Sequence, residues 1–433
     1  MEWQLTPESV LVGSFLLYTS AMPISRFVWR TELADMDIPF LEAHILAALG
    51  LLVGLYLGNL LAAKSPREKY VVPSAPLSAF RCLSFGIGAL LAVVIYVYYS
   101  VGMTVSNLLK PYTFERTVIS EYSTLDTLIF PVAIAIVLHC YMGVLPQRRR
   151  RKWLHRAVLC IALAMSGLIL VRGIRNLALI LWLPLCGMIL HKRRLPIGRA
   201  MAIAGSVYLL FSAVAIVRSY GLEAGADAYS ITLDGLDPAV GELGTTYHVY
   251  SEFQKLSSGD ELEYGKTYLL GFASNLVPRT FWKDRPKSTA EQFAAKYYQN
   301  DDTLDGVGFS PVVEAMDNFS RIGIFPIFLV FAVSVVLVAR YLRTKGRWGL
   351  LSYSIMLPML VNWNRIDADA SGKIFLIYVA LFVLLDPLMY GLPAKARTVR
   401  LSAGGRRRWH VKYALGDADG TIPARGQVTR EPQ

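Results

Sequence analysis

The chain has 433 residues, of which 54% are hydrophobic and only 18% are charged. Soluble domains average about 45–50% apolar and roughly 25% charged residues, so this composition excludes a disordered tail protein and disfavours an ordinary soluble enzyme. The net charge of +12 would indicate nucleic-acid binding in a soluble protein. In a membrane protein the question is instead which side each charge occupies. We therefore expect an all-α, polytopic membrane protein with membrane lipids, and no nucleic acid, as partners.

Ten apolar runs have the Leu, Ile, Val, Ala and Phe content of membrane-spanning helices. The N-terminus lacks a basic region and a small-residue cleavage site, so the first run is expected to remain as a helix. The run 176–191 is short for a span. In chain order the predicted helices cover roughly 7–25, 40–62, 79–101, 124–144, 153–171, 176–191, 198–218, 321–342, 348–363 and 373–392.

Lysine and arginine predict the orientation of these helices. With the N-terminus in the cytoplasm, 27 of the 44 basic residues fall in inner loops and in the C-terminal tail. The short loops agree one by one, and short loops carry the strongest orientation signal. Both termini are therefore predicted to be cytoplasmic, and the basic tail 393–433 is predicted to be disordered and to face anionic lipid.

One outer connection is much longer than the others. The membrane helices in 1–218 and those in 321–392 are separated by the insertion 219–320. A loop of this length without structure of its own is unusual, so we expect an ordered, functional, extracytoplasmic domain.

Three segments of the insertion have sequence patterns that predict their local structure. The pieces 243–256 and 288–298 have helical patterns, and Ser288 with Glu291 matches a capping box. The stretch 267–282 is apolar but too short to span, so we expect it to lie on the membrane surface or dip into it.

Several cations lie at outer helix ends, on the side that orientation rules disfavour. Arg172 and Arg175 occupy a tight RGIR turn, and Arg365 lies in the turn NWNRIDADASGK. Each could reach the interface or pair with a carboxylate, but ionisable groups near the membrane core are also functional candidates. A shared anionic ligand explains the set better, because guanidinium groups donate paired hydrogen bonds to phosphate. A lipid pyrophosphate is the anion expected at an outer membrane face.

The insertion also carries groups suited to sugars. Rings such as Tyr247 and Trp282 can pack on apolar sugar faces, although they can equally form a small core and an interfacial belt. His248 is either a general base or a polar helix residue. Glu314 precedes the eighth run near Arg321, where a carboxylate could bind a sugar hydroxyl or accept its proton.

The sequence has no clear metal-binding or nucleotide-binding motif. The chain has no DxD, HExxH or His/Cys cluster at ligand spacing, and DADAS and DADG are weak matches. It also lacks a P-loop, so direct coupling to ATP is not expected. The sequence therefore predicts neither a metal site nor a cofactor.

Two motifs of the chain are LVPRTFWKDRPK at 276–287 and GVGFSPVVEAMDNFSRIG at 306–323. They resemble motifs of the Wzy-type polymerases of bacterial oligosaccharide repeat units. Arg285 replaces the usual lysine before proline, Asp317 replaces an aromatic residue, and Ser320 replaces a glycine. The positions that match the family pattern are Pro278, Arg279, Lys283, Pro286, Gly306, Gly308, Ser310, Glu314, Asn318 and Phe319.

The resemblance implies a GT-C-like membrane glycosyltransferase at the outer face of the bacterial inner membrane. Such an enzyme joins repeat units on undecaprenyl pyrophosphate without nucleotide sugar or metal. It makes a flippase and a chain-length regulator candidate partners, and it makes Glu314 and His248 the candidate catalytic residues. The candidate pyrophosphate-binding and substrate-binding residues are Arg172, Arg175, Arg279, Lys283, Arg285, Arg321, Arg365, Tyr247, Trp282 and Asn318.

Three alternatives share some of these features. An O-antigen ligase has the same fold class and donor, and would rely on a loop histidine, for which His248 is the candidate. A transporter or flippase of lipid-linked sugar would show internal repeats and helices broken at the membrane midplane. The sequence shows no convincing repeat, and the insertion 219–320 is longer than a gate needs. A scaffold protein of an envelope assembly is the third alternative.

Overall fold

The computed structural model describes most of the apolar runs and part of the insertion. Isolated described positions are 195, 196, 198, 202, 205, 206, 282, 286, 289, 290, 292 and 293. The continuous described ranges are 2–3, 5–29, 37–63, 77–100, 123–145, 151–171, 175–190, 242–256, 262–277, 309–366 and 368–391.

The described residues are almost entirely helical. The exception is a two-residue antiparallel pair between β1 (Glu2–Trp3) and β2 (Leu195–Pro196). Helices cover nine of the ten predicted runs, while most of the run 198–218 and the tail 393–433 lie outside the described residues. These helices are α1 (Pro7–Trp29), α2 (Asp37–Ala63), α3 (Ala79–Ser100), α6 (Ser123–Val144), α7 (Lys152–Val171), α8 (Arg175–Leu190), α14 (Pro311–Arg343), α15 (Gly346–Asn362) and α16 (Ala368–Tyr390).

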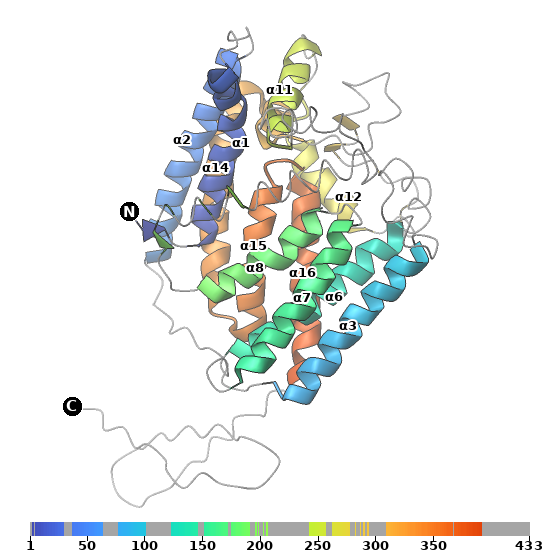
Figure 1. Ribbon diagram of the computed structural model, residues 1–433. Helices are drawn as coiled ribbons and strands as arrows, with labels where there is room; N and C mark the ends of the chain where they lie inside the picture. Colours follow the sequence, from blue (N-terminus) through green and yellow to red (C-terminus); the bar gives the residue numbers. More distant parts are fainter. Residues whose placement is uncertain are drawn as a thin grey trace, which may run out of the picture.

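Five of the described helices, namely α2, α3, α7, α14 and α16, are long and apolar enough to cross a membrane. The apolar parts of α6 and α8 are shorter, at Leu128–Val144 and Asn176–Leu190. These features establish an all-helical protein of the polytopic membrane class. Figure 1 shows the long helices as a bundle with α11 (Thr245–Leu256) at one end.

The short helix α15 joins two halves of the hydrophobic core. Leu351 and Ile355 belong to the half of the core that α3, α6, α7, α8 and α16 also form, whereas Met356 and Leu360 belong to the half that α1, α2, α11 and α14 form. A helix that is buried on both faces lies at the centre of its bundle rather than at the lipid surface. Because α15 is held at the centre of the bundle, the position of the turn that follows it is set as well.

A glycine stripe brings α2 and α14 into close contact. A methyl group at Gly54 would lie 2.4 Å from the Leu329 carbonyl oxygen, and one at Gly50 would lie 2.5 Å from that of Phe325. Gly58 meets α14 one turn further on, completing a GxxxGxxxG pattern. Small residues at this spacing let membrane helices approach backbone to backbone.

We expect Gly54→Ile to lower the free energy of unfolding by about 3 kcal/mol, because the side chain must push the helices apart. Thermal unfolding in detergent measures the loss. Gly88→Ile is the matched control, because nothing lies within 4 Å of a methyl group there. Equal losses at both positions would contradict a close helix contact at Gly54.

Helix α14 is broken near its first third. Phe319 and Ser320 have non-helical backbone angles, and Ser320 has φ 57° and ψ −166°. The predicted eighth helix starts at 321, which coincides with this break rather than with the helix start. The preceding segment is helical because Pro311 occupies the first turn, where its missing N–H costs no hydrogen bond. Glu314 therefore lies on a short helix that leads into the long one.

Ser320 adopts a backbone conformation that essentially only glycine tolerates, and glycine is the residue that the Wzy-type motif has here. We expect Ser320→Gly to raise the free energy of unfolding by about 1 kcal/mol, measured by thermal unfolding. Ser334→Gly, in regular helix of the same α14, should instead lower it by about 1 kcal/mol. The same sign at both positions would disprove strain at Ser320.

Candidate functional site

Glu314 is a buried carboxylate held by three elements. Its side chain is 1% exposed. Oε1 accepts a hydrogen bond from the Thr267 hydroxyl at 3.3 Å, and Oε2 accepts one from the Ala368 backbone N–H at 3.3 Å. Thr267 begins η3 (Thr267–Gly271), and Ala368 begins α16. A buried charge needs such donors, so the position of this carboxylate is defined by the fold.

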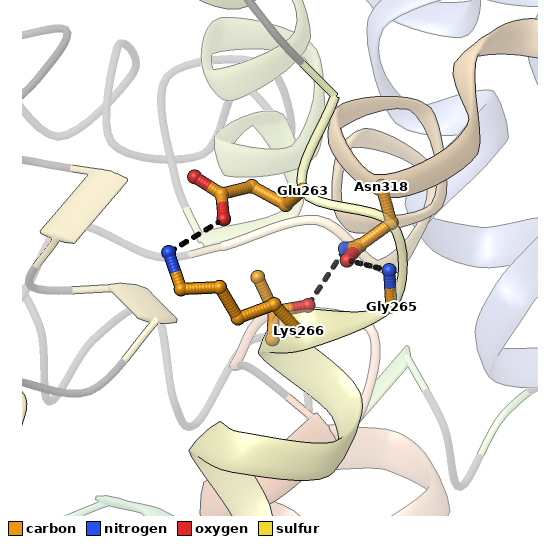
Figure 2. A network of polar contacts seen from close by, with 5 residues as sticks. Glu263, Gly265, Lys266 and Asn318 are labelled. Atoms are coloured by element: carbon orange, nitrogen blue, oxygen red, sulfur yellow. Dashed lines mark hydrogen bonds and ion pairs between the residues drawn. The ribbon is translucent and has the colours of Figure 1, made fainter.

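Asn318 orients the hydroxyl group that contacts Glu314. Its Nδ2 donates to Thr267 Oγ1 at 2.6 Å and to the Glu314 carbonyl oxygen at 2.8 Å. Its Oδ1 accepts the Gly265 N–H at 2.9 Å, as Figure 2 shows. Because Thr267 accepts from Asn318, its own proton is free to point at Glu314. The chain of bonds from Asn318 to Thr267 to Glu314 thus fixes one carboxylate oxygen.

The turn before η3 caps the helix that carries Glu314. The N–H groups of Glu263 and Tyr264 donate to the carbonyl oxygens of Asp317 and Asn318 at 3.0 and 3.1 Å. Gly265 follows with φ 83°, and its Cα faces the Phe319 ring. These bonds satisfy carbonyl groups that the break in α14 leaves without helical partners. The insertion and the membrane helix therefore form one unit around Glu314.

Arg365 lies in the turn between α15 and α16, next to the same unit. Its carbonyl oxygen accepts the Phe309 N–H at 2.6 Å, which joins the turn to the start of α14. Its Nη1 donates to Asn176 Oδ1 at 3.0 Å. Asn176 directly follows Arg175, the first residue of α8. Arg365 and the backbone of Arg175 are therefore neighbours, although they are 190 positions apart in the sequence.

The polar turn around Arg365 is itself anchored. Asn364 is 2% exposed, and its Nδ2 donates to Ser14 Oγ of α1 at 3.0 Å. Its carbonyl oxygen accepts the Thr246 hydroxyl of α11 at 3.2 Å. The turn thus contacts α1, α8, α11 and α14, and brings Arg365 close to the buried Glu314.

Comparison with known proteins now identifies the family. The family model described as O-antigen polysaccharide polymerase Wzy matches residues 10–392. The chain belongs to the Wzy family. No curated protein and no solved structure matches it. The resemblance predicted from the two motifs is confirmed, and with it a membrane protein of polysaccharide biosynthesis.

Arg321 of this Wzy protein lies in a second polar cluster, with α1, α2 and α11. Its Nη2 is 2.5 Å from Glu42 Oε2, and both side chains are about half exposed, at 48% and 56%. Arg26 similarly pairs with Asp37 at 3.1 Å. The sequence left open whether these arginines pair with carboxylates, and Arg321 and Arg26 do so here. Because Arg321 is half exposed, its guanidinium remains accessible to an anion.

Tyr247 lies in the same cluster, within the protein core. The side chain is 7% exposed, and its hydroxyl accepts a hydrogen bond from Arg26 at 3.3 Å. Burial, followed by the hydrogen bond and negative charge of Asp37, raises the pKa of Tyr247 to about 12. The ring packs edge-on against Phe40 at 5.1 Å. The ring therefore packs in the core beside α2, and its predicted role toward a sugar stays a prediction.

The other predicted site residues differ in how far they can be placed. His248 is exposed on α11, and Trp282 is partly exposed. The side chain of Arg175 is not described. Arg172, Arg279, Lys283 and Arg285 lie outside the described residues. Of the predicted set, the described residues bring together Glu314, Asn318 and the Arg365 turn.

Two residues of the site were missed from the sequence, namely Thr267 and Asn176. Burial and the carboxylates of Glu314 and Asp317 raise the pKa of Tyr268, the neighbour of Thr267, well above its usual value. The Tyr264-Gly265 pair before Thr267 is a turn signal that could have indicated a chain reversal here. Asn176 had no signal beyond its position after the RGIR turn.

Proposed function

We infer that this Wzy protein joins oligosaccharide repeat units carried on undecaprenyl pyrophosphate, by metal-independent glycosyl transfer at the outer face of the inner membrane. The observation that carries the proposal is Glu314, a buried carboxylate with both oxygens oriented by donors and with the Arg365 turn beside it. A GT-C-like fold would accommodate this arrangement at the outer ends of membrane helices.

In this mechanism Glu314 acts on the acceptor sugar. Its carboxylate takes the proton of the acceptor hydroxyl as that oxygen forms a bond to the anomeric carbon of the donor. The bond between that carbon and the pyrophosphate breaks, and its electron pair leaves with the pyrophosphate. The two donors to Glu314 keep it in one orientation, which favours alignment of the hydroxyl.

The leaving pyrophosphate needs positive charge where its own negative charge develops. Arg365 supplies a guanidinium on a turn anchored by Asn364, and Arg175 begins the neighbouring helix. Guanidinium groups bind phosphate oxygens through two parallel hydrogen bonds and remain charged. We propose that Arg172, Arg279, Lys283 and Arg285 complete this group.

The orientation of the chain is part of the proposal. The bias of lysine and arginine supports cytoplasmic termini and places the insertion 219–320 outside the cytoplasm. Glu314 and α11 then share the outer end of the bundle with the lipid-linked substrate. A flippase that delivers the substrate and a chain-length regulator are the proposed partners.

A ligase is the second candidate, and the exposed His248 on α11 is the observation that favours it. Glycan profiling of a deletion strain separates the two functions. Loss of a polymerase leaves single repeat units on the final acceptor, so short glycans should replace the polymer. Long polymer that remains on its lipid carrier would identify a ligase and contradict the proposal.

A further inference from the structure

Three buried polar side chains near the Glu314 site each have an atom without a hydrogen-bond partner among the residues that the structure describes. They are Ser310, Asn362 and Ser371, which are 0%, 2% and 7% exposed. The unpartnered atoms are the two serine hydroxyls and the Asn362 amide oxygen. Such groups are costly to bury, and in native proteins each one calls for a specific explanation.

Each of the two serines lies three or four residues from a residue of the Glu314 site. Ser310 accepts the Glu314 N–H through its carbonyl oxygen at 2.9 Å, four residues before it. Ser371 follows Ala368, the donor to Glu314 Oε2, by three residues on α16. Residues three or four apart on a helix share a face, with Cβ atoms about 5–6 Å apart. Ser371 thus shares a face of α16 with Ala368, while Ser310 is joined to Glu314 by a backbone hydrogen bond at the start of α14.

Asn362 approaches from the end of α15. Its carbonyl oxygen accepts the Arg365 N–H at 2.9 Å, and the Arg365 carbonyl oxygen accepts the N–H of Phe309. Phe309 is the neighbour of Ser310, so the backbone of Asn362 belongs to the same contact between the start of α14 and the turn after α15.

The position of Ser310 makes its unpartnered hydroxyl notable. Ser310 is the N-cap of α14, where a serine hydroxyl ordinarily accepts a backbone N–H of the first turn. No such bond forms here. The hydroxyl is therefore unused by the helix it precedes, and removing it takes no cap from the fold.

We propose that Ser310, Asn362 and Ser371 form, together with Glu314, a subsite that receives sugar hydroxyl groups of the lipid-linked substrate. Two hydroxyls and an amide oxygen beside a carboxylate match the donors and acceptors of a sugar. The proposal rests on the proposed function, because it names the part of the substrate that this site recognises.

Entry of a sugar requires the cover of Glu314 to move. The described segment that covers it is η3, which contacts the carboxylate through the Thr267 hydroxyl and presents Leu269 outward, 77% exposed. A π-helical turn such as η3 is rare and is frequent at functional sites. Displacement of η3 would break the hydrogen bond from Thr267 and open a route to the carboxylate.

The test is binding of the undecaprenyl-pyrophosphate-linked repeat unit to protein in nanodiscs, in a Glu314→Gln background that prevents turnover. Ser310→Ala and Ser371→Ala should each weaken binding about fivefold, as expected for one lost hydrogen bond. Undecaprenyl pyrophosphate without sugar should bind all variants equally. Ser352→Ala is the matched control, because this buried hydroxyl donates to the Trp348 carbonyl oxygen within its own helix.

The outcomes separate the subsite from the proposed function. Unchanged binding of the sugar-bearing lipid in both serine variants overturns the subsite. Weaker binding together with an equal fall in thermal stability overturns it as well, because the hydroxyls would then stabilise the fold through ordered water rather than bind the sugar. Weaker sugar-dependent binding at wild-type stability supports the subsite even if the wild-type protein makes no polymer, a result that would overturn only the proposed function.

Discussion

Glu314→Gln is expected to reduce polymer formation by roughly 100-fold to 10,000-fold, the range for loss of a general base. Glutamine keeps the size of the side chain. Its amide oxygen can still accept the Ala368 N–H, and its NH2 group can donate to the Thr267 hydroxyl oxygen in place of the bond that the carboxylate accepted. It cannot, however, take a proton from an acceptor hydroxyl. The readout is the length distribution of the polymer in a deletion strain that expresses the variant, at matched protein level.

Glu252→Gln is the control for this variant. Glu252 lies on α11 and pairs with Lys255 at 2.7 Å on the exposed side of the helix, where an ion pair contributes little. The polymer made by the Glu252→Gln protein should have the same length distribution as that of the wild type. A Glu314→Gln protein that makes full-length polymer would remove Glu314 from the proposed mechanism.

Arg365→Lys is expected to slow polymerisation by about 100-fold. Lysine retains the positive charge but lacks the planar fork that binds two phosphate oxygens. The backbone role of Arg365, whose carbonyl oxygen accepts the Phe309 N–H, is unaffected by the change. Single-turnover kinetics with purified protein measure the effect on the chemical step.

Asn176→Ala distinguishes catalysis from packing at this position. It removes the partner of the Arg365 guanidinium but leaves the guanidinium itself. We expect a loss of stability of about 1 kcal/mol, with a much smaller effect on rate than Arg365→Lys. If both variants slow the reaction equally, Arg365 acts by holding α8 in place rather than by binding the leaving group.

The sequence predicted the helical architecture well, because long apolar runs leave few alternatives in a membrane. Helices occur at nine of the ten predicted runs in the residues that the structure describes. The start of α14 could not be placed, since the polar segment around Glu314 lacks the hydropathy of a span. The glycine stripe on α2 was present in the sequence, but its partner helix could be identified only from the packing of Gly54 on Leu329.

Part of the site was predictable from the sequence. Glu314 was indicated by its place before the eighth run as well as by the family pattern, whereas Asn318 was indicated by the family pattern alone. Thr267 was missed, since it lies 47 residues away and joins the site through a single hydroxyl. The partner of Arg365 was missed for the same reason, because contacts between distant turns depend on how α15 orders the bundle. Arg321 was predicted as a site residue, but its side chain pairs with Glu42 in a separate cluster. Its role in substrate binding stays a prediction.

The most direct measurement of the central claim is a reconstitution with purified components. The protein is incubated with the undecaprenyl-pyrophosphate-linked repeat unit in the presence of EDTA, without nucleotide sugar. We predict a ladder of products that differ by one repeat unit, and no ladder with Glu314→Gln. Bound substrate that remains a single repeat unit with the wild-type protein would contradict the claim that this chain polymerises lipid-linked oligosaccharides.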